Sequence, residues 1–389
     1  MKEKGICKVG NSVLQERIKI LVINTVGLNR NGITQVIFDY YSRFDMRKYD
    51  VCVGSGEQDS EEVRQMFRDA GIKVRLLPSR RQKTAGYVLV LYRLMAREKY
   101  DIIHVHGNSA TMAMELMAAR AAGCPVRIAH VHNSTCDARR ADRLMRPAFY
   151  RSYTDAYACG QMAGEWMYGG RSFRTVKNGR SIRKFSYDPA VRLRMREKCG
   201  LGPDTLAVGH VGNFNEQKNH PFLLRVFQKI RERQPDAKLF LAGYGHCEGS
   251  VRALVKELEL EDGVVFLGLT DRIQDLLQAM DVMVLPSRHE GLPLVAVEWQ
   301  MAALPCVLSD AITEECAFTD LVRFLSLDER YEKWADTVLE MRHRDRARDA
   351  LLAEELAGRN GYDIEKDATW LMAEFDRRTG RILHCSPNP

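Results

Sequence analysis

The sequence lacks any long apolar run. No apolar stretch approaches the ~20 residues that a helix needs to cross a bilayer. The start of the chain, MKEKGICKVGNSVLQERIK, lacks the apolar core of a secretion signal. The ten cysteines include no C-x-x-C pair, which argues against a disulfide framework or a zinc ribbon. We therefore expect a cytoplasmic protein with reduced thiols.

Internal repeats, low-complexity tracts and aromatic residues interleaved with basic ones are also missing. The last absence argues against nucleic acid as a partner. Lys and Arg number 58 against 51 Asp and Glu, which gives a formal net charge of +7. This modest excess suits an anionic partner, such as a nucleotide or an acidic lipid surface, but it equally suits a solvated basic surface without a ligand.

Short β-branched runs alternate with amphipathic stretches in both halves of the chain. Near-continuous apolar runs separated by helices are typical of parallel sheets that are covered on both faces. We therefore predict an α/β protein with two Rossmann-like, doubly wound domains. The runs are IKILVIN, VCVGS, VRLLP, DIIHVHG, VRIAHVHN, AYACG and TVKNG in the first half, and LAVGHVG, KLFLAG, VVFLG, VMVLPS, PCVLSD and VRFLSL in the second.

A polar, basic stretch at residues 178–204 separates the halves, because the strand pattern restarts after it. We predict a flexible N-terminal extension at 1–17, a first domain at 18–182 and a second at 183–362. The tail, 363–389, is predicted to contain a helix with Ile364, Ala368, Leu371 and Phe375 on one face. Further helices are expected near 33–44, 61–70, 85–98 and 110–122.

Two segments that follow predicted strands have features of phosphate sites, and ligands of doubly wound sheets bind at strand carboxyl ends. Gly27 and Gly32 bracket a loop before a helix, where backbone N–H groups approach anions. A plain tight turn explains this spacing equally well, because the Lys-Ser/Thr of a P-loop is missing. In GHVGNFNEQKNHPF, Lys218 stands just before a helix that Pro221 would begin. It suits a phosphate, although an ordinary surface lysine is the alternative.

Two strands, DIIHVHG and VRIAHVHN, each carry a His-x-His pair. Period two places His104 and His106 on one strand face, and His130 and His132 likewise. Four histidines at neighbouring strand ends would suit zinc, so a metallohydrolase is one alternative. We favour packed or hydrogen-bonded histidines for His104 and His130. His106 and His132 stand last before their loops and are expected to face a ligand cleft.

The segment VLPSRHEGLPLVAVEW carries two carboxylates across a strand-to-helix turn. Pro293 fits the first turn of the helix, and the N–H groups of Leu294 and Val295 would be free for an anion. Glu290 precedes this helix start and Glu298 follows it. Carboxylates accept hydrogen bonds from sugar hydroxyls, so the arrangement suits a nucleotide sugar, which has sugars on both sides of its phosphates. The alternative is a solvated Glu290 and a surface Glu298.

Together these segments resemble a known family. E-x₇-E after LPS, GNFNEQKNH after a strand, the Asn-Gly that precedes Phe185, and SDAITEE at Ser309 resemble the GT-B glycosyltransferases of family GT4, especially the branch that builds capsular and exopolysaccharides. The resemblance runs from about residue 18 to the tail helix and is more specific in the second half. It implies an acceptor domain at 18–182 and a donor domain at 183–362 around a cleft, with the terminal helix returning to the first domain.

The resemblance also implies an activity. A sugar would pass from a nucleotide sugar, with UDP the expected nucleotide, to a glycan or lipid-linked glycan with retention of configuration, and without metal or cofactor. By position, Glu290 would contact the donor sugar, Glu298 the ribose hydroxyls, and Lys218 the diphosphate. Other donor-binding positions are Gly32, Asn213, Leu294 and Val295, and His132 matches the histidine near the transferred sugar. Glu290, His132 and Lys218 are thus the implied catalytic residues.

Two positions depart from the family pattern. Gly212-Asn213 stands where the family often has Gly-Arg, and Asn31-Gly32 where it often has Gly-Gly. Without that guanidinium, Lys218 is the main cation for the leaving diphosphate, unless Arg272 or another cation substitutes. A non-catalytic nucleotide-sugar binder is therefore an alternative. An epimerase or phosphorylase of the same fold is another.

Two basic clusters fall in the predicted acceptor domain. They are RRQK at Arg80 and DARRADRLMR at Asp137. Basic side chains near a membrane surface gain ~1 kcal/mol each from anionic headgroups, so peripheral binding at the inner face of the plasma membrane is one interpretation. A solvated helix face is the other. The candidates in the second cluster are Arg139, Arg140, Arg143 and Arg146.

Overall fold

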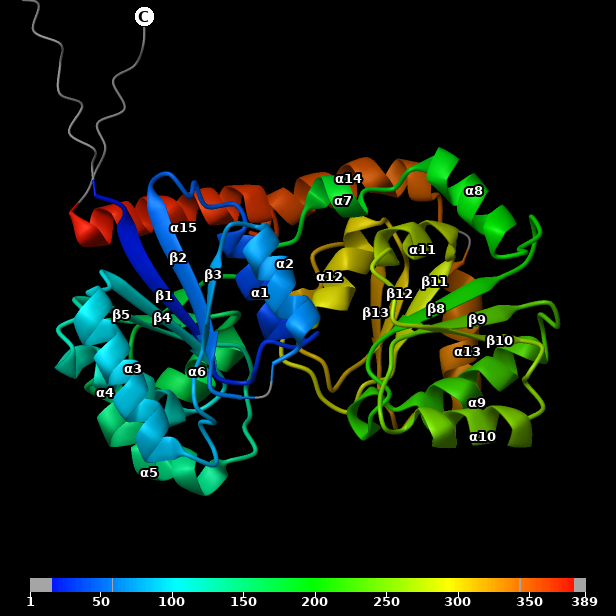
Figure 1. The fold of residues 1–389 in the computed structure, drawn as a ribbon. Coiled ribbons are helices and arrows are strands. Elements are labelled where there is room, and N and C mark those ends of the chain that lie inside the picture. The colour runs from blue at the N-terminus through cyan, green and yellow to red at the C-terminus, as the bar shows by residue number, and fades with distance from the viewer. Residues whose placement is uncertain (1–15, 58, 343, 381–389) are drawn as a thin grey trace, which may run out of the picture.

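The computed structural model describes residues 16–57, 59–342 and 344–380. Figure 1 shows two α/β domains side by side, each a parallel sheet with helices on its faces. This confirms the predicted fold class. The predicted extension at 1–17 lies almost entirely outside the described residues. Among the described helices, none is both long and apolar enough to cross a membrane.

The first sheet has seven parallel strands in the order β3-β2-β1-β4-β5-β6-β7. The continuous apolar run of β1 follows from its place inside the sheet, where helices cover both faces. The strands are β1 Ile18–Asn24, β2 Tyr49–Ser55, β3 Lys73–Leu76, β4 Ile102–Gly107, β5 Val126–Val131, β6 Asp155–Ala158 and β7 Arg174–Thr175. The helices are α1 Gly32–Tyr41, α2 Glu61–Asp69, α3 Thr84–Glu98, η1 Ala110–Met112, α4 Ala113–Ala121, α5 Arg139–Tyr150 and α6 Gln161–Tyr168.

The second sheet has six parallel strands in the order β10-β9-β8-β11-β12-β13. In both sheets the first strand in the chain lies centrally and the order reverses there, the arrangement that creates ligand sites in doubly wound folds. The strands are β8 Ala207–Val211, β9 Lys238–Ala242, β10 Val264–Gly268, β11 Val282–Leu285, β12 Cys306–Ser309 and β13 Val322–Leu325. The helices are η2 Glu216–Lys218, α9 His220–Arg231, α10 Glu248–Glu257, α11 Ile273–Ala279, α12 Leu294–Met301, η3 Glu314–Cys316, α13 Tyr331–Met341 and α14 Arg346–Arg359.

The chain passes between the sheets twice, and the two passages are bonded to each other. After β7 it passes Arg180 and enters α7 (Ile182–Phe185) and α8 (Pro189–Lys198). On the return, the Arg180 N–H donates to the Tyr362 carbonyl at 2.9 Å, and the Ile364 N–H donates to the Arg180 carbonyl at 3.2 Å. The boundaries at 182 and 362 stay predictions, but both fall close to this bridge.

The last helix, α15 (Ile364–Thr379), packs on the first domain. The four residues expected on one face, Ile364, Ala368, Leu371 and Phe375, are all buried in the same apolar cluster as β1 and α1. Figure 1 shows α14 and α15 following one another along the same side of the two sheets. The end of the chain therefore ties the first domain to the second.

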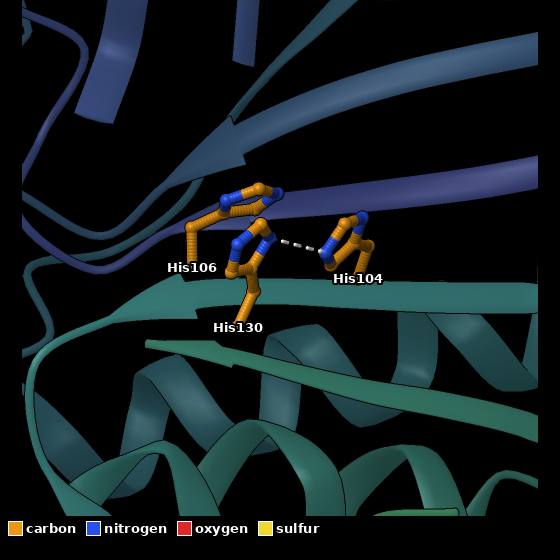
Figure 2. A group of neighbouring side chains, drawn as sticks. All are labelled: His104, His106 and His130. Carbon is orange, nitrogen blue, oxygen red and sulfur yellow. Dashed lines mark hydrogen bonds between the residues drawn. The ribbon is translucent and has the colours of Figure 1, made fainter. Parts of the chain in front are cut away.

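The first sheet has a buried array of histidines at the ends of β4 and β5 (Figure 2). The His104 Nε2 lies 3.2 Å from the His130 Nδ1, and the His106 Nδ1 lies 2.9 Å from the His132 Nε2. The Tyr41 hydroxyl lies 2.7 Å from the His104 Nδ1. Burial lowers the pKa of all four histidines, to about 3 for His104 and His132. The array is therefore neutral at neutral pH.

Acidification from pH 7 to pH 5 is expected to destabilise the first domain by about 2 kcal/mol for each of His104 and His132. The ordinary histidine pKa is near 6.5 and the folded value is about 3, so the unfolded chain binds the proton first. The stability that the neutral histidines contribute is present above pH 6.5, and it is lost as the pH falls from there toward 3. Urea unfolding followed by circular dichroism at both pH values measures the loss.

The variant His104→Asn isolates one histidine of the array. Its stability should fall less on acidification than that of the wild type, because one proton-binding group is gone from the unfolded state. The control His246→Asn removes an exposed histidine of the second domain and should keep the wild-type pH dependence. Equal pH dependence in His104→Asn and the wild type would contradict the prediction.

Candidate functional site

Loops at the carboxyl ends of strands from both sheets meet at the domain junction. A Cβ on Gly32, after β1, would lie 3.7 Å from the Leu294 side chain at the start of α12. A Cβ on Gly291, after β11, would lie 3.0 Å from the His132 carbonyl oxygen, after β5. Gly291 thus lets the second domain approach the backbone of the first. The structure brings the predicted glycine loop and the E-x₇-E segment together.

Lys218 and Glu290 form an ion pair at this junction. The Lys218 Nζ lies 2.7 Å from the Glu290 Oε1, and the two side chains are 14% and 11% exposed. The Asn215 side chain accepts the Lys218 N–H at 3.1 Å and fixes the turn η2. A short parallel bridge to Ile312 fixes the backbone of Glu290. The alternatives of a solvated Glu290 and an ordinary surface lysine do not match this geometry.

The loop that follows β9 supports the Lys218 loop. A Cβ on Gly243, whose φ is +151°, would lie 1.9 Å from the Gly212 carbonyl oxygen, so only glycine permits this backbone contact. Gly212 in turn packs against the Lys218 side chain. A Cβ added to Gly212 would lie 3.0 Å from the Lys218 Cε. Sequence analysis missed Gly243, although the pattern Gly-Tyr-Gly directly after an apolar strand was a signal for a close backbone approach.

The structure offers little to replace the guanidinium missing at Asn213. Asn213 is exposed, and its backbone carbonyl accepts the Asn215 N–H at 2.9 Å. Arg272, the candidate substitute, is 75% exposed and pairs with Asp275 at the start of α11. In the described part of the chain, no recorded contact joins Arg272 to Lys218 or Glu290. Lys218 is therefore the cation that pairs with Glu290, the first acid of the E-x₇-E segment.

Helix α12 begins one residue later than the sequence suggests. Pro293 precedes the helix as its N-cap, and Leu294 is the first helical residue. The N–H groups of Leu294 and Val295 stand in the first turn, where helical N–H groups have no intrahelical acceptor. They lie at the helix end that attracts anions, opposite the Gly32 loop. The predicted anion site at this helix start therefore keeps its geometry.

Glu298 lies inside the protein and has a partner that the sequence did not reveal. The Arg180 Nη2 lies 2.6 Å from the Glu298 Oε1, and the Arg180 Nη1 pairs with Asp39 of α1. Burial raises the pKa of Glu298, and the charge of Arg180 opposes the rise. The alternative of a surface Glu298 is wrong. Arg180 directly follows Asn178-Gly179, a pair that carried the family resemblance, so its position in the chain was the available signal.

The two histidines expected to face a cleft are buried. His106 is 2% exposed and bonds to His132, so the expectation that it faces a cleft is wrong. The reason is that the rings of His104, His130 and His132 pack around the His106 ring. His132 is also buried, and an interaction with the Asn178 side chain opposes the lowering of its pKa by burial. His132 meets the second domain through its backbone, at Gly291.

Ring nitrogens of the histidine array are paired with one another between the ends of β4 and β5. Ligand atoms of His104, His106 and His130 lie within 4.8 Å of one another. The rings of His104 and His106 are tilted by 35° with their centres 4.1 Å apart, and those of His104 and His130 are parallel within 6°. Zinc bonds lie in the ring plane at about 2.0–2.1 Å and must converge on one point. Both ring nitrogens of His104 are hydrogen-bonded, one to the Tyr41 hydroxyl and one to His130, so the hydrogen-bonded interpretation is favoured over the metallohydrolase.

Comparisons with known proteins agree with this architecture. A family model described as "Glycosyl transferase 4-like domain" matches residues 31–161, and one described as "Glycosyl transferases group 1" matches residues 191–352. The putative glycosyltransferase EpsF of Bacillus subtilis is 31% identical over 367 residues, which cover 91% of this chain and 95% of EpsF. An Escherichia coli protein, UDP-Gal:alpha-D-GlcNAc-diphosphoundecaprenol alpha-1,3-galactosyltransferase, is 29% identical over 245 residues, or 59% of this chain and 62% of that one.

Solved structures of low sequence identity share the fold. Anabaena Alr3699/HepE in complex with UDP superposes with a TM-score of 0.78 at 18% identity, covering 92% of this chain and 100% of that one. WaaG, a glycosyltransferase involved in lipopolysaccharide biosynthesis, has a TM-score of 0.68 at 14% identity, with 92% and 100% covered. The fold, the two family models and the near full-length similarity to EpsF agree: the chain belongs to the group 1 glycosyltransferases of the GT-B fold.

Proposed function

We propose that the protein is a retaining, metal-independent glycosyltransferase of family GT4 that transfers a hexosyl group from a UDP-sugar. The observation that carries the proposal is the sheltered Lys218–Glu290 pair beside the start of α12. The choice of UDP draws on the neighbour HepE, which was solved with UDP and with UDP-glucose, and on the UDP-Gal in the name of the Escherichia coli relative. No cofactor has a role in this scheme.

The donor diphosphate would bind between the Gly32 loop and the start of α12. Lys218 would then exchange its partner Glu290 for the diphosphate. The freed Glu290 carboxylate would accept hydrogen bonds from hydroxyls of the donor sugar. Negative charge grows on the diphosphate as the glycosidic bond breaks, so Lys218 and the N–H groups of Leu294 and Val295 stabilise the transition state more than the bound donor.

Retention is proposed to occur by attack on the same face that the diphosphate leaves. The departing phosphate would help to take the proton of the acceptor hydroxyl, which makes a covalent carboxylate intermediate unnecessary. His132 keeps a pKa of about 3, so it would line the site as a neutral group rather than act as an acid. Closure of the domains would exclude water and limit hydrolysis of the donor.

The proposed acceptor is a glycan on a lipid diphosphate, used to make a cell-surface polysaccharide. The names of two similar proteins support this choice, since one acts on a diphosphoundecaprenol-linked sugar and WaaG acts in lipopolysaccharide biosynthesis. A cavity adjoins the loop after His132 and contains two arginines that suit an anionic group. It is lined by Ser134, Thr135, Cys136, Arg139, Asp142, Arg146 and Trp166.

Helix α5 is the proposed contact with the inner membrane surface. Arg139, Arg140 and Arg143 are exposed there beside Leu144, whose side chain is 81% exposed. Two of the expected basic residues do not belong to this surface. Arg146 pairs with Asp142 at 2.8 Å, and Arg80 pairs with the buried Glu115 at 2.6 Å. The proposal of peripheral membrane binding therefore rests on the first turns of α5.

Asn213 favours one competing function, a nucleotide-sugar binder without turnover. Such a protein would bind UDP-sugars and release no nucleotide, even with a lipid-linked acceptor. An epimerase would act without an acceptor, and a phosphorylase would consume phosphate. A panel of nucleotide sugars, scored by thermal shift and by nucleotide release with and without acceptor and phosphate, separates these activities and names the donor.

The variant Glu290→Gln is expected to lower kcat for acceptor-dependent nucleotide release by about 100- to 1,000-fold. The amide removes the charge that pairs with Lys218 and that would hold the donor sugar, while Lys218 stays available for the diphosphate. UDP binding, measured by calorimetry, should therefore persist. The control Glu329→Gln changes an exposed acid and should match the wild type. A Glu290→Gln enzyme within about threefold of wild-type kcat would contradict the assignment.

Removal of divalent metal is expected to change the rate by no more than about twofold, because Lys218 and the α12 N–H groups take the place of a metal at the diphosphate. The measurement is nucleotide release in excess EDTA, compared with Mg²⁺ and Mn²⁺ added in excess of the chelator. A loss of activity in EDTA that either cation restores would show that a metal takes part.

The variant Arg140→Glu/Arg143→Glu is expected to weaken binding to anionic vesicles by about tenfold or more, since each basic residue contributes ~1 kcal/mol. Sedimentation with phosphatidylcholine vesicles, with and without phosphatidylglycerol, measures binding at low and high salt. The matched control Arg194→Glu/Lys198→Glu reverses two exposed charges on α8 of the second domain. Absence of wild-type binding to anionic vesicles at low salt would end the membrane proposal.

A further inference from the structure

A buried ion triad joins three parts of the chain directly behind the proposed donor site. Arg180 pairs through Nη1 with Asp39 and through Nη2 with Glu298, the latter at 2.6 Å. The side chains of Arg180, Asp39 and Glu298 are 7%, 13% and 8% exposed. Asp39 belongs to α1 of the first domain, Glu298 to α12 of the second, and Arg180 to the passage between them.

The triad is held from several sides. The backbone of Arg180 is bonded in both directions to the return passage, at Tyr362 and Ile364. The Arg180 guanidinium carbon lies 5.2 Å from the centre of the Phe185 ring. The Asp39 Oδ1 accepts a hydrogen bond from Gln35 at 3.0 Å, within α1. Arg180 therefore has a fixed backbone, a ring on one side and a carboxylate at each of its two terminal nitrogens.

The side chains of the triad are shielded from water, so the charges around Glu298 help to decide its pKa. Burial raises the pKa of Glu298, the charge of Arg180 lowers it, and the charge of Asp39 raises it again. Arg180, whose Nη2 lies 2.6 Å from the carboxylate, and Lys184 both favour the ionised form of Glu298. An ionised carboxylate accepts hydrogen bonds from hydroxyl groups, whereas a protonated one is a weaker acceptor.

The position of the triad relative to the proposed diphosphate site indicates which part of the nucleotide Glu298 would face. The Gly32 loop and the start of α12 face each other, with 3.7 Å between a Cβ on Gly32 and the Leu294 side chain. At 1.5 Å per residue, Asp39 lies about 10 Å along α1 from Gly32, and Glu298 about 6 Å along α12 from Leu294. The triad thus lies behind the two helix starts that face the proposed diphosphate site, on the side where we place the ribose of the nucleotide.

We propose that Arg180 is a positioning residue for donor recognition: it holds Glu298 toward the ribose hydroxyls of the nucleotide and, through Asp39, fixes that carboxylate to the first domain. The inference rests on the proposed function, because the ribose belongs to the proposed donor. Lysine cannot replace Arg180, since one compact ammonium group does not reach two carboxylates with the fork geometry of a guanidinium.

The test compares UDP with 2′,3′-dideoxy-UDP by isothermal titration calorimetry. Wild type is expected to bind UDP about 10- to 100-fold more tightly, because only UDP offers hydroxyls to the charged Glu298. Arg180→Lys should weaken UDP binding by about tenfold and leave dideoxy-UDP binding nearly unchanged, so the preference approaches one. Glu298→Gln should remove the same preference, and the double variant should add little, as expected for residues that act as one unit.

Three controls separate positioning from general damage. Thermal melts establish that each variant is folded. Asp271→Asn breaks a different contact between the domains, the 2.7 Å pair with Arg30, and should keep the wild-type preference for UDP. In steady-state assays with the UDP-sugar, Arg180→Lys should raise KM by about tenfold while kcat stays within about threefold, because ribose binding is the same in the ground and transition states.

The outcomes distinguish this inference from the proposed function. Equal affinity of the wild type for the two nucleotides, or equal weakening of both in Arg180→Lys, would overturn the role of Arg180 and leave the transferase intact. Failure of the wild type to bind UDP or any other nucleoside diphosphate would overturn the proposed function and this inference with it. Loss of the preference in Asp271→Asn would also overturn it, because the effect would then come from domain contact in general.

Discussion

A carboxylate that leaves water needs a cation, and this requirement organises the junction between the two domains. Glu290 and Glu298 both lie in one short strand-to-helix segment, and both are sheltered. Lys218 meets the first from a turn of the same domain. Arg180 meets the second from the passage between the domains. The loops, the start of α12 and the closely packed glycines bring each acid within reach of its basic partner.

The strands and the tail helix were predictable from the sequence because their signal is local. A strand buried on both faces is largely apolar, so every predicted run overlaps an observed strand, and the tail helix buries the face that its period indicated. The contacts of the site were less predictable. Arg180 and Asp39 are 141 residues apart, and no local pattern marks a pair at that separation. The burial of His106 depends on rings on, and directly after, the neighbouring strand β5, which the periodicity of one strand cannot reveal.

The buried histidines and the buried acids of this protein are accommodated in different ways. The histidines of the first sheet can lose their charge, and burial makes them a neutral, hydrogen-bonded part of the core. The acids of the E-x₇-E segment are each provided with a basic partner. A site with the proposed task of binding hydroxyls and releasing a diphosphate needs ionised groups, whereas a sheet interior does not. The placement of lysine and arginine, rather than of the acids themselves, is therefore what distinguishes the site from the core.

The ion triad also limits how the two halves of such a protein can be exchanged. Glu298 belongs to the second sheet, but its cation lies before that domain begins and the second acid lies on α1 of the first. A chimera that takes residues from 183 onward from this chain would contain the E-x₇-E segment without Arg180, the partner of Glu298. The relative that provides the first half would have to supply equivalents of Asp39 and Arg180. The segment that must be exchanged together is therefore larger than the second Rossmann-like domain, and it begins before Arg180.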